Sequence, residues 1–146
     1  MNARIVVGVV GAITQLLGLG GLFRPEWVMN FVGYAVASNA PTTLVRGEVR
    51  AGYGGMQIVG AVFTLLSAPD PREHQGRLLL LGFLWLGAAA GRLLGVFVDG
   101  SPGIFGWLSL ALELSGGGAL IVASQAAGRA SIPSAPAGSE APPLSA

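Results

Sequence analysis

The sequence contains no cysteine and few charged side chains. The absence of cysteine excludes a disulfide framework and a thiol nucleophile. Charged residues make up 10% of the chain and hydrophobic residues 52%, whereas a soluble domain has about 25% charged residues. With 146 residues, the chain is long enough for one membrane domain of four helical spans of about 20 residues each.

The scarcity of ionisable residues also argues against two kinds of site. The single histidine, His74, lies in a loop beside Glu73, which offers too few ligands for a metal centre. We therefore expect no metal and no cofactor. The net charge is +1, and the basic residues are scattered arginines without a basic stripe, which argues against nucleic-acid binding.

Four apolar segments predict an all-α membrane protein, an antiparallel bundle of four transmembrane helices. The expected spans cover about residues 5–23, 43–66, 78–98 and 104–124. The first segment also fits a secretory signal. Its length exceeds that of a signal core, however, and no clear cleavage site follows it, which favours a retained span.

Segments outside the spans complete the domain organisation. Aromatic residues recur on one face of residues 26–37, which predicts a short interfacial helix; an irregular loop is the alternative. Residues 1–128 form the expected membrane domain, and residues 129–146, rich in Ala, Pro and Ser, form an expected disordered tail. A modest excess of loop arginines on the side of the termini predicts that both termini are cytoplasmic, in a bacterial inner (plasma) membrane.

Ionisable residues inside the apolar spans are the strongest functional signal. A charge near the bilayer centre costs about 2.5–3.5 kcal/mol, so it is kept only when it is partnered or used. From the helical rise, Arg50, Arg92 and Glu113 lie roughly 10, 9 and 13 Å deep, measured from the same side of the membrane. A guanidinium can bind a carboxylate through two parallel hydrogen bonds. Either arginine is therefore a candidate partner for Glu113.

The second span gathers further polar residues on one face. At about 100° per residue, Arg46, Arg50, Tyr53 and Gln57 share a stripe. Glu48, Gly52 and Gly55 occupy the opposite side, where the missing side chains would let a neighbouring backbone approach.

On the third span, Gly87, Gly91 and Gly95 repeat every four residues and predict a ridge for close helix packing. Trp85, Arg92 and Asp99 repeat every seven residues and share another face. The resulting candidate binding residues are Arg46, Glu48, Arg50, Tyr53, Gln57, Arg92, Asp99 and Glu113.

Three interpretations of this polar layer stay open. It can be a structural salt-bridge network that fixes helix register, a role well attested for buried ion pairs. It can be a binding pocket in which Tyr53 and Gln57 add directional hydrogen bonds. It can also be catalytic, with Glu113 as the one candidate acid, but neighbouring arginines would favour the ionised form of Glu113. We therefore assign no catalytic residue.

The spacing Arg46-x-Glu48-x-Arg50-x-x-Tyr-Gly-Gly55, followed by Gly91-Arg92, Asp99-Gly100 and Glu113, resembles a family of small bacterial four-helix membrane proteins known as a domain of unknown function. The resemblance covers about residues 5–123. It implies the four-span topology and a shared role for the charged positions, and it implies no activity. In layout the chain is also loosely similar to DoxX-like membrane proteins.

The sequence thus predicts a non-enzymatic integral membrane protein. Its expected role is to bind a small amphipathic molecule or a membrane lipid in the polar layer, or to serve as a subunit of a homo-oligomer or larger membrane complex. The alternatives are a membrane enzyme that acts on a lipid-like substrate through Glu113 and a small proton-coupled transporter. The spans lack an inverted repeat, which gives the transporter little support.

Overall fold

The structure, a computed structural model, describes residues 2–32 and 42–129, and this part of the chain is built of helices and turns without a strand. The elements are α1 (Ala3–Phe23), α2 (Pro25–Val32), α3 (Thr42–Val49), η1 (Arg50–Met56), α4 (Gln57–Ser67), α5 (Gln75–Asp99) and α6 (Gly103–Arg129). The all-helical prediction is confirmed. The predicted tail beyond residue 129 and the predicted interfacial helix beyond Val32 lie outside the described residues.

Three of the described helices, α1, α5 and α6, are long and apolar enough to cross a membrane. They correspond to the predicted first, third and fourth spans. Three buried hydroxyl side chains donate back to carbonyls four residues earlier: Thr14 to Val10 (2.8 Å), Thr64 to Gly60 (2.8 Å) and Ser67 to Phe63 (2.7 Å). Their hydroxyl groups are thus satisfied without water.

The predicted second span, residues 43–66, is divided into three consecutive helical segments. α3, η1 and α4 follow one another without a break from Thr42 to Ser67, and η1 is a π-helix. Its sequence, Arg-Ala-Gly-Tyr-Gly-Gly-Met, is rich in glycine, the weakest α-helix former apart from proline. None of the three segments alone is a spanning helix, so four spans stay a prediction.

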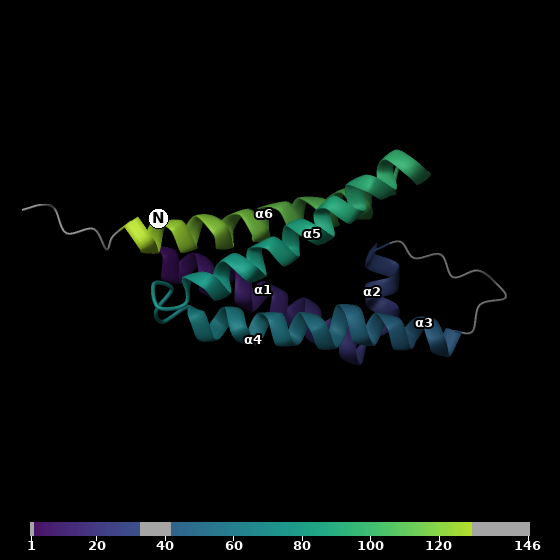
Figure 1. The fold of residues 1–146 in the computed structure, drawn as a ribbon. Coiled ribbons are helices and arrows are strands. Elements are labelled where there is room, and N and C mark those ends of the chain that lie inside the picture. Colours follow the sequence, from purple (N-terminus) through teal and green to yellow (C-terminus); the bar gives the residue numbers. More distant parts are fainter. Residues whose placement is uncertain (1, 33–41, 130–146) are drawn as a thin grey trace, which may run out of the picture.

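The helices form two pairs (Figure 1). One pair is α5 with α6, and the other is α1 with the run of η1 and α4. α5 packs most extensively against α6, and α1 packs against η1 and α4 and also contacts α6. Contacts between α4 and α5 are few. In Figure 1 the α5–α6 pair and the α3–α4 layer lie close together near the N-terminus and diverge toward the other end, where α2 lies across the bundle axis.

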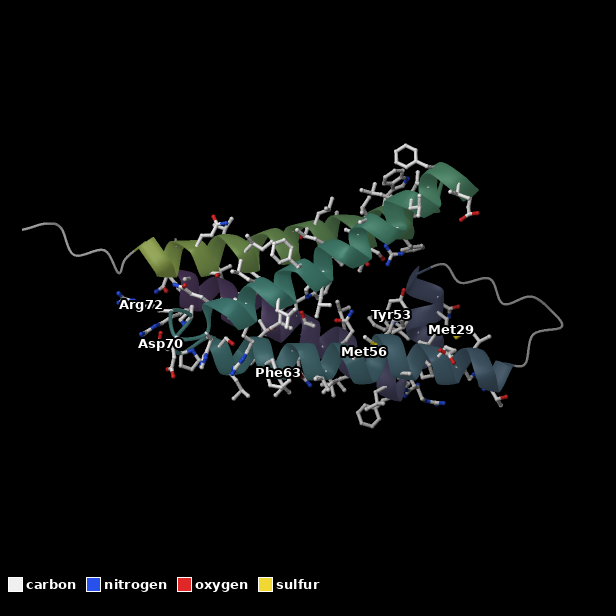
Figure 2. All side chains as sticks on the ribbon, in the orientation of Figure 1. Met29, Tyr53, Met56, Phe63, Asp70 and Arg72 are labelled. Carbon is white, nitrogen blue, oxygen red and sulfur yellow. The ribbon has the colours of Figure 1, made fainter. Side chains whose placement is uncertain are left out.

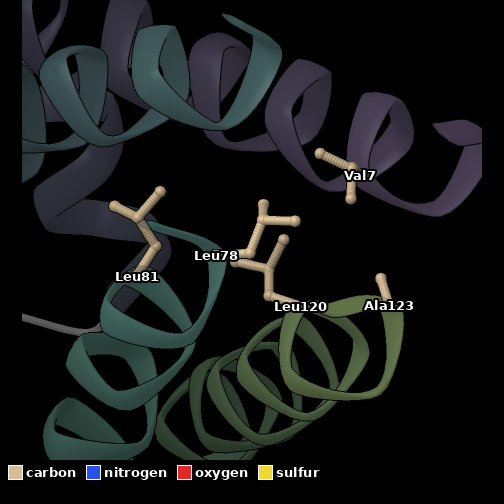
Figure 3. Packing of buried hydrophobic residues seen from close by; sticks show 5 residues of the cluster. All are labelled: Val7, Leu78, Leu81, Leu120 and Ala123. Atoms are coloured by element: carbon tan, nitrogen blue, oxygen red, sulfur yellow. The ribbon is translucent and has the colours of Figure 1, made fainter. Parts of the chain in front are cut away.

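The closed end of the molecule contains the apolar core. Val7, Leu78, Leu81, Leu120 and Ala123 form a buried cluster from α1, α5 and α6 (Figure 3). The α4–α5 turn lies at the same end, where Arg4 and Arg72 border one surface hollow with Ala127, and Figure 2 shows Asp70 and Arg72 there. Packing at this end leaves the opposite end free to diverge.

Glycines allow α1 to approach η1 and α4 at backbone distance. A methyl group added at Gly18 would lie 2.9 Å from the Ile58 backbone nitrogen, and one added at Gly21 would collide with the Tyr53 carbonyl. On η1, a methyl group at Gly54 would lie 2.8 Å from the backbone nitrogen of Leu22. α1 is therefore held against η1 by contacts that only small residues permit.

The predicted glycine ridge on α5 is wrong for packing within the chain. Within residues 2–32 and 42–129, a methyl group added at Gly87 or Gly91 would meet no atom of a packing neighbour within 4 Å. The close contact to α6 instead uses Gly82, whose added methyl group would lie 3.0 Å from the Gly117 carbonyl oxygen. The predicted backbone approach at Gly52 and Gly55 is wrong as well, because Gly54 makes it. Periodicity identified glycine-rich faces without showing which face meets a neighbour.

Gly21→Ala tests the close contact between α1 and η1. The added methyl group has no room beside the Tyr53 carbonyl, so we expect overpacking to lower the free energy of unfolding by about 1–3 kcal/mol. Gly8→Ala is the matched control on the same helix, since a methyl group there meets nothing within 4 Å. Thermal unfolding in detergent measures both variants, and equal melting temperatures would contradict the contact.

Candidate functional site

An ion pair between α5 and α6 is the centre of the candidate site. The Arg92 guanidinium donates from Nε to Glu113 Oε2 (3.0 Å) and from Nη2 to Glu113 Oε1 (2.6 Å). The Glu113 side chain is 10% exposed and that of Arg92 23%. Two parallel charge-assisted hydrogen bonds hold both groups in one geometry. The predicted pairing of Arg92 with Glu113 is confirmed.

Tyr53 brings η1 to this ion pair. Its side chain lies beside the Arg92 guanidinium, with which it interacts electrostatically, and Figure 2 shows Tyr53 between the layer of α3 and α4 and the α5–α6 pair. The guanidinium of Arg92 therefore connects α5 to α6 through Glu113 and to η1 through Tyr53. This network links the two helix pairs where they diverge.

These polar groups border a small space, called here the central cavity. Its volume is about 50 Å³, enough for a few water molecules. Trp27 and Val28 of α2 contribute to its lining. The polar and aromatic side chains that line it are Trp27, Tyr53, Gln57, Trp85, Arg92, Ser109 and Glu113.

Two apolar grooves meet the central cavity. The α1–α6 groove has a volume of about 440 Å³ and shares Leu17, Trp85 and Leu112 with the cavity. The α4–α5 groove has a volume of about 230 Å³ and shares Gln57, Trp85 and Glu113 with it. Trp85 lines all three spaces, and Glu113 lines the α4–α5 groove as well as the central cavity.

The structure brings together four of the eight predicted site residues: Tyr53, Gln57, Arg92 and Glu113. Glu48 and Asp99 are exposed. Arg46 instead pairs with Glu26 of α2 at 3.0 Å, and both of these side chains are about half exposed. These positions do not test whether the eight residues bind a ligand, so their binding role stays a prediction.

Arg50 is not a partner of Glu113, contrary to one of the expected pairings. Its Nε donates to the Leu22 carbonyl oxygen at 3.3 Å, near the end of α1. The reason is the π-helical winding that begins at Arg50. Hydrogen bonds from i to i+5 make each turn wider, so residues three apart no longer share the face that 100° per residue predicts. Tyr53 faces the ion pair and Arg50 faces α1.

Several cavity residues were not among the predicted site residues. Ser109 is buried and precedes Glu113 by one helical turn, and Trp85 precedes Arg92 by two turns. Both signals are present in the sequence, because residues four or seven apart share a helix face. The contributions of Leu17, Trp27 and Val28 depend on tertiary packing, and no local pattern indicates them.

The chemistry of the site follows from its charge balance. The Arg92 guanidinium and the Glu113 carboxylate satisfy each other through two charge-assisted hydrogen bonds. The pair as a whole is neutral and still offers N–H donors and oxygen acceptors to the central cavity. Such a site is suited to holding a polar group.

Removing one partner tests the coupling of the pair. Glu113→Gln leaves a buried guanidinium that cannot lose its proton, and we expect it to lower the free energy of unfolding by about 3–5 kcal/mol. Arg92→Gln should cost less, because a carboxyl group can be neutralised by protonation.

The double variant Arg92→Gln/Glu113→Gln should recover part of this loss, since neither side chain then carries a buried charge. Denaturant titration in detergent measures all three variants. A double variant as unstable as the sum of the two single variants would show that the two residues are not coupled.

Comparison with known proteins identifies a family and no activity. Neither the search of curated proteins nor the search of solved structures gave a match. The family described as a domain of unknown function, DUF4345, matches residues 2–124, which include every residue of the central cavity. The expected resemblance to such a family is confirmed, while the bacterial source and the DoxX-like layout stay predictions. The chain belongs to the domain-of-unknown-function family DUF4345.

Proposed function

We propose that this protein is an integral membrane protein that binds a small amphipathic molecule between its two helix pairs. The polar end of the molecule would lie in the central cavity and its apolar chain in the α1–α6 groove. One observation carries the proposal: a largely buried ion pair borders a cavity that shares Leu17, Trp85 and Leu112 with an apolar groove of about 440 Å³. Ligand sites typically combine an apolar space of this size with a few placed polar groups.

The dimensions of the α1–α6 groove support a single extended chain. On α1 its lining runs from Ile5 to Leu17, about 18 Å of helix at the usual rise. The lining is formed almost entirely by aliphatic side chains and Trp85, with Thr14 and Ser115 as the hydroxyl-bearing residues. The Thr14 hydroxyl already donates to its own helix. A hydrocarbon chain can therefore fill the groove without leaving a polar group of Thr14 unsatisfied.

The membrane topology is part of the same proposal. We infer that the helical run of α3, η1 and α4 spans the membrane together with α1, α5 and α6, so that both termini lie on the cytoplasmic side. The length of the run supports this, because residues 42–67 are helical without a break and a spanning helix needs about 20 residues. The ion pair would then lie inside the membrane, where a charge is tolerated when it is paired with an opposite charge.

A role as a subunit of a larger membrane assembly is a second candidate. Gly87 and Gly91 meet no neighbour within the described part of the chain, and α5 is the least buried of the three candidate spans. Small residues on a lipid-facing helix surface permit close approach of another helix. This function and ligand binding use different surfaces of α5, so one does not exclude the other.

Filling the α1–α6 groove should remove the bound molecule. Gly116 lines the groove, so Gly116→Leu places a side chain in the space that the apolar chain would occupy. Gly118→Leu is the matched control, because an added side chain there begins in open space. Native mass spectrometry of protein purified in mild detergent should show an adduct of lipid-like mass with wild type and Gly118→Leu and none with Gly116→Leu. Wild type without an adduct, or equal adducts on both variants, would contradict the proposed site.

Single cysteines test the four-span topology, because the natural chain has none to interfere. Asn2→Cys, Glu73→Cys and Ser101→Cys place a thiol at three exposed positions outside the candidate spans. With an impermeant maleimide on intact cells, we expect Ser101→Cys to react, and Asn2→Cys and Glu73→Cys to react only after permeabilisation. Asn2 and Glu73 on opposite sides of the membrane would mean that residues 42–67 do not span it.

A further inference from the structure

We propose that the polar end of the bound molecule is uncharged and presents a hydrogen-bonding oxygen, as a long-chain alcohol does. The inference deepens the proposed function and rests on it. It concerns the class of molecule that the central cavity selects, and it follows from three features of that cavity: its charge balance, its remaining hydrogen-bonding groups and its size.

The charge balance of the cavity disfavours an ionic ligand. Arg92 and Glu113 neutralise each other through two direct hydrogen bonds, and both side chains are largely buried. An anion near Arg92 would compete with Glu113, and a cation near Glu113 would compete with Arg92. Either ion would leave an unpaired charge in apolar surroundings, which is far more costly than burying a hydrogen-bonded neutral group.

The remaining hydrogen-bonding groups suit a neutral oxygen. Arginine has five N–H donors and no acceptor, and the two hydrogen bonds from Arg92 to Glu113 engage two of the five. Arg92 lines the cavity, so its other donors are the ones that a ligand oxygen can reach. Glu113 retains acceptor capacity, and Gln57 adds an amide that both donates and accepts. A hydroxyl group can bind this set in both directions.

The size of the cavity limits the polar end to a few atoms. A volume of about 50 Å³ accommodates a few water-sized groups and is too small for the phosphodiester and headgroup of a phospholipid. The apolar space beside it is much larger, about 440 Å³. A molecule with a small polar end and one long apolar chain fits both volumes.

Three brominated probes of equal chain length test the inference: an alcohol, a carboxylate and an amine. Wild-type protein in phosphatidylcholine bilayers is titrated with each at mildly alkaline pH, and bromine quenching of tryptophan fluorescence reports binding. Trp85 borders the cavity and both grooves, so subtracting the quenching of Trp85→Phe isolates the signal of the site. We expect the alcohol to bind at least about tenfold more tightly than either charged probe, when affinity is expressed relative to the concentration of probe in the membrane.

Changing the charge of the pair should change the preference. Glu113→Gln leaves Arg92 as an unpaired cation beside the cavity, so the carboxylate should become the tightest probe, by about tenfold or more over the alcohol. The double variant Arg92→Gln/Glu113→Gln restores neutrality and should again prefer the alcohol. A purely structural ion pair would alter stability in these variants without exchanging the preferred probe.

The outcomes separate the two proposals. If wild type shows no quenching specific to Trp85 with any probe, the proposed ligand-binding function fails. If wild type binds a probe in the groove but prefers a charged one, the binding function stands and the inference is overturned. The inference of a neutral ligand is also overturned if Glu113→Gln, shown to be folded by its circular dichroism, keeps the preference for the alcohol.

Discussion

The pairing of Arg92 with Glu113 inside apolar helices is the constraint on which the rest of this structure depends. An unpartnered charge is costly in a hydrocarbon environment, and two hydrogen bonds join Arg92 of α5 to Glu113 of α6. Tyr53 of η1 lies beside the same guanidinium and interacts with it electrostatically. One guanidinium thus positions side chains from both helix pairs around the same cavity.

Closely packed contacts and apolar grooves lie along the same helices. The core of Val7, Leu78, Leu81, Leu120 and Ala123 holds α1, α5 and α6 together near the N-terminus, and glycine contacts hold α1 against η1 and α4. The α4–α5 groove of about 230 Å³ reaches Glu113, and the α1–α6 groove of about 440 Å³ extends along α1 from Ile5 to Leu17. Val6, Val10 and Trp85 pack against the core and also line the α1–α6 groove, so the core and the open space share side chains.

The sequence predicted the helical architecture and the central ion pair because both follow from simple constraints. Apolar length identifies α1, α5 and α6, and equal depth pairs Arg92 with Glu113. The same reasoning failed for Arg50, because the π-helical winding of η1 changes which residues share a face, and no periodic pattern reports it. It also failed for Gly87 and Gly91, because composition does not show which glycine face meets a neighbour; Gly82 and Gly117 make that contact. The grooves and the contribution of α2 to the cavity lining depend on tertiary packing alone.

The geometry of the ion pair in a lipid bilayer is the most direct test of this account. Solid-state NMR of protein labelled with ¹³C-glutamate and ¹⁵N-arginine measures the dipolar coupling between the Glu113 carboxyl carbon and the Arg92 guanidinium nitrogens, with Glu113→Gln assigning the signal. The account predicts a strong coupling to two guanidinium nitrogens and a carboxylate chemical shift. The absence of that coupling in folded protein, or the chemical shift of a protonated carboxyl group, would contradict it.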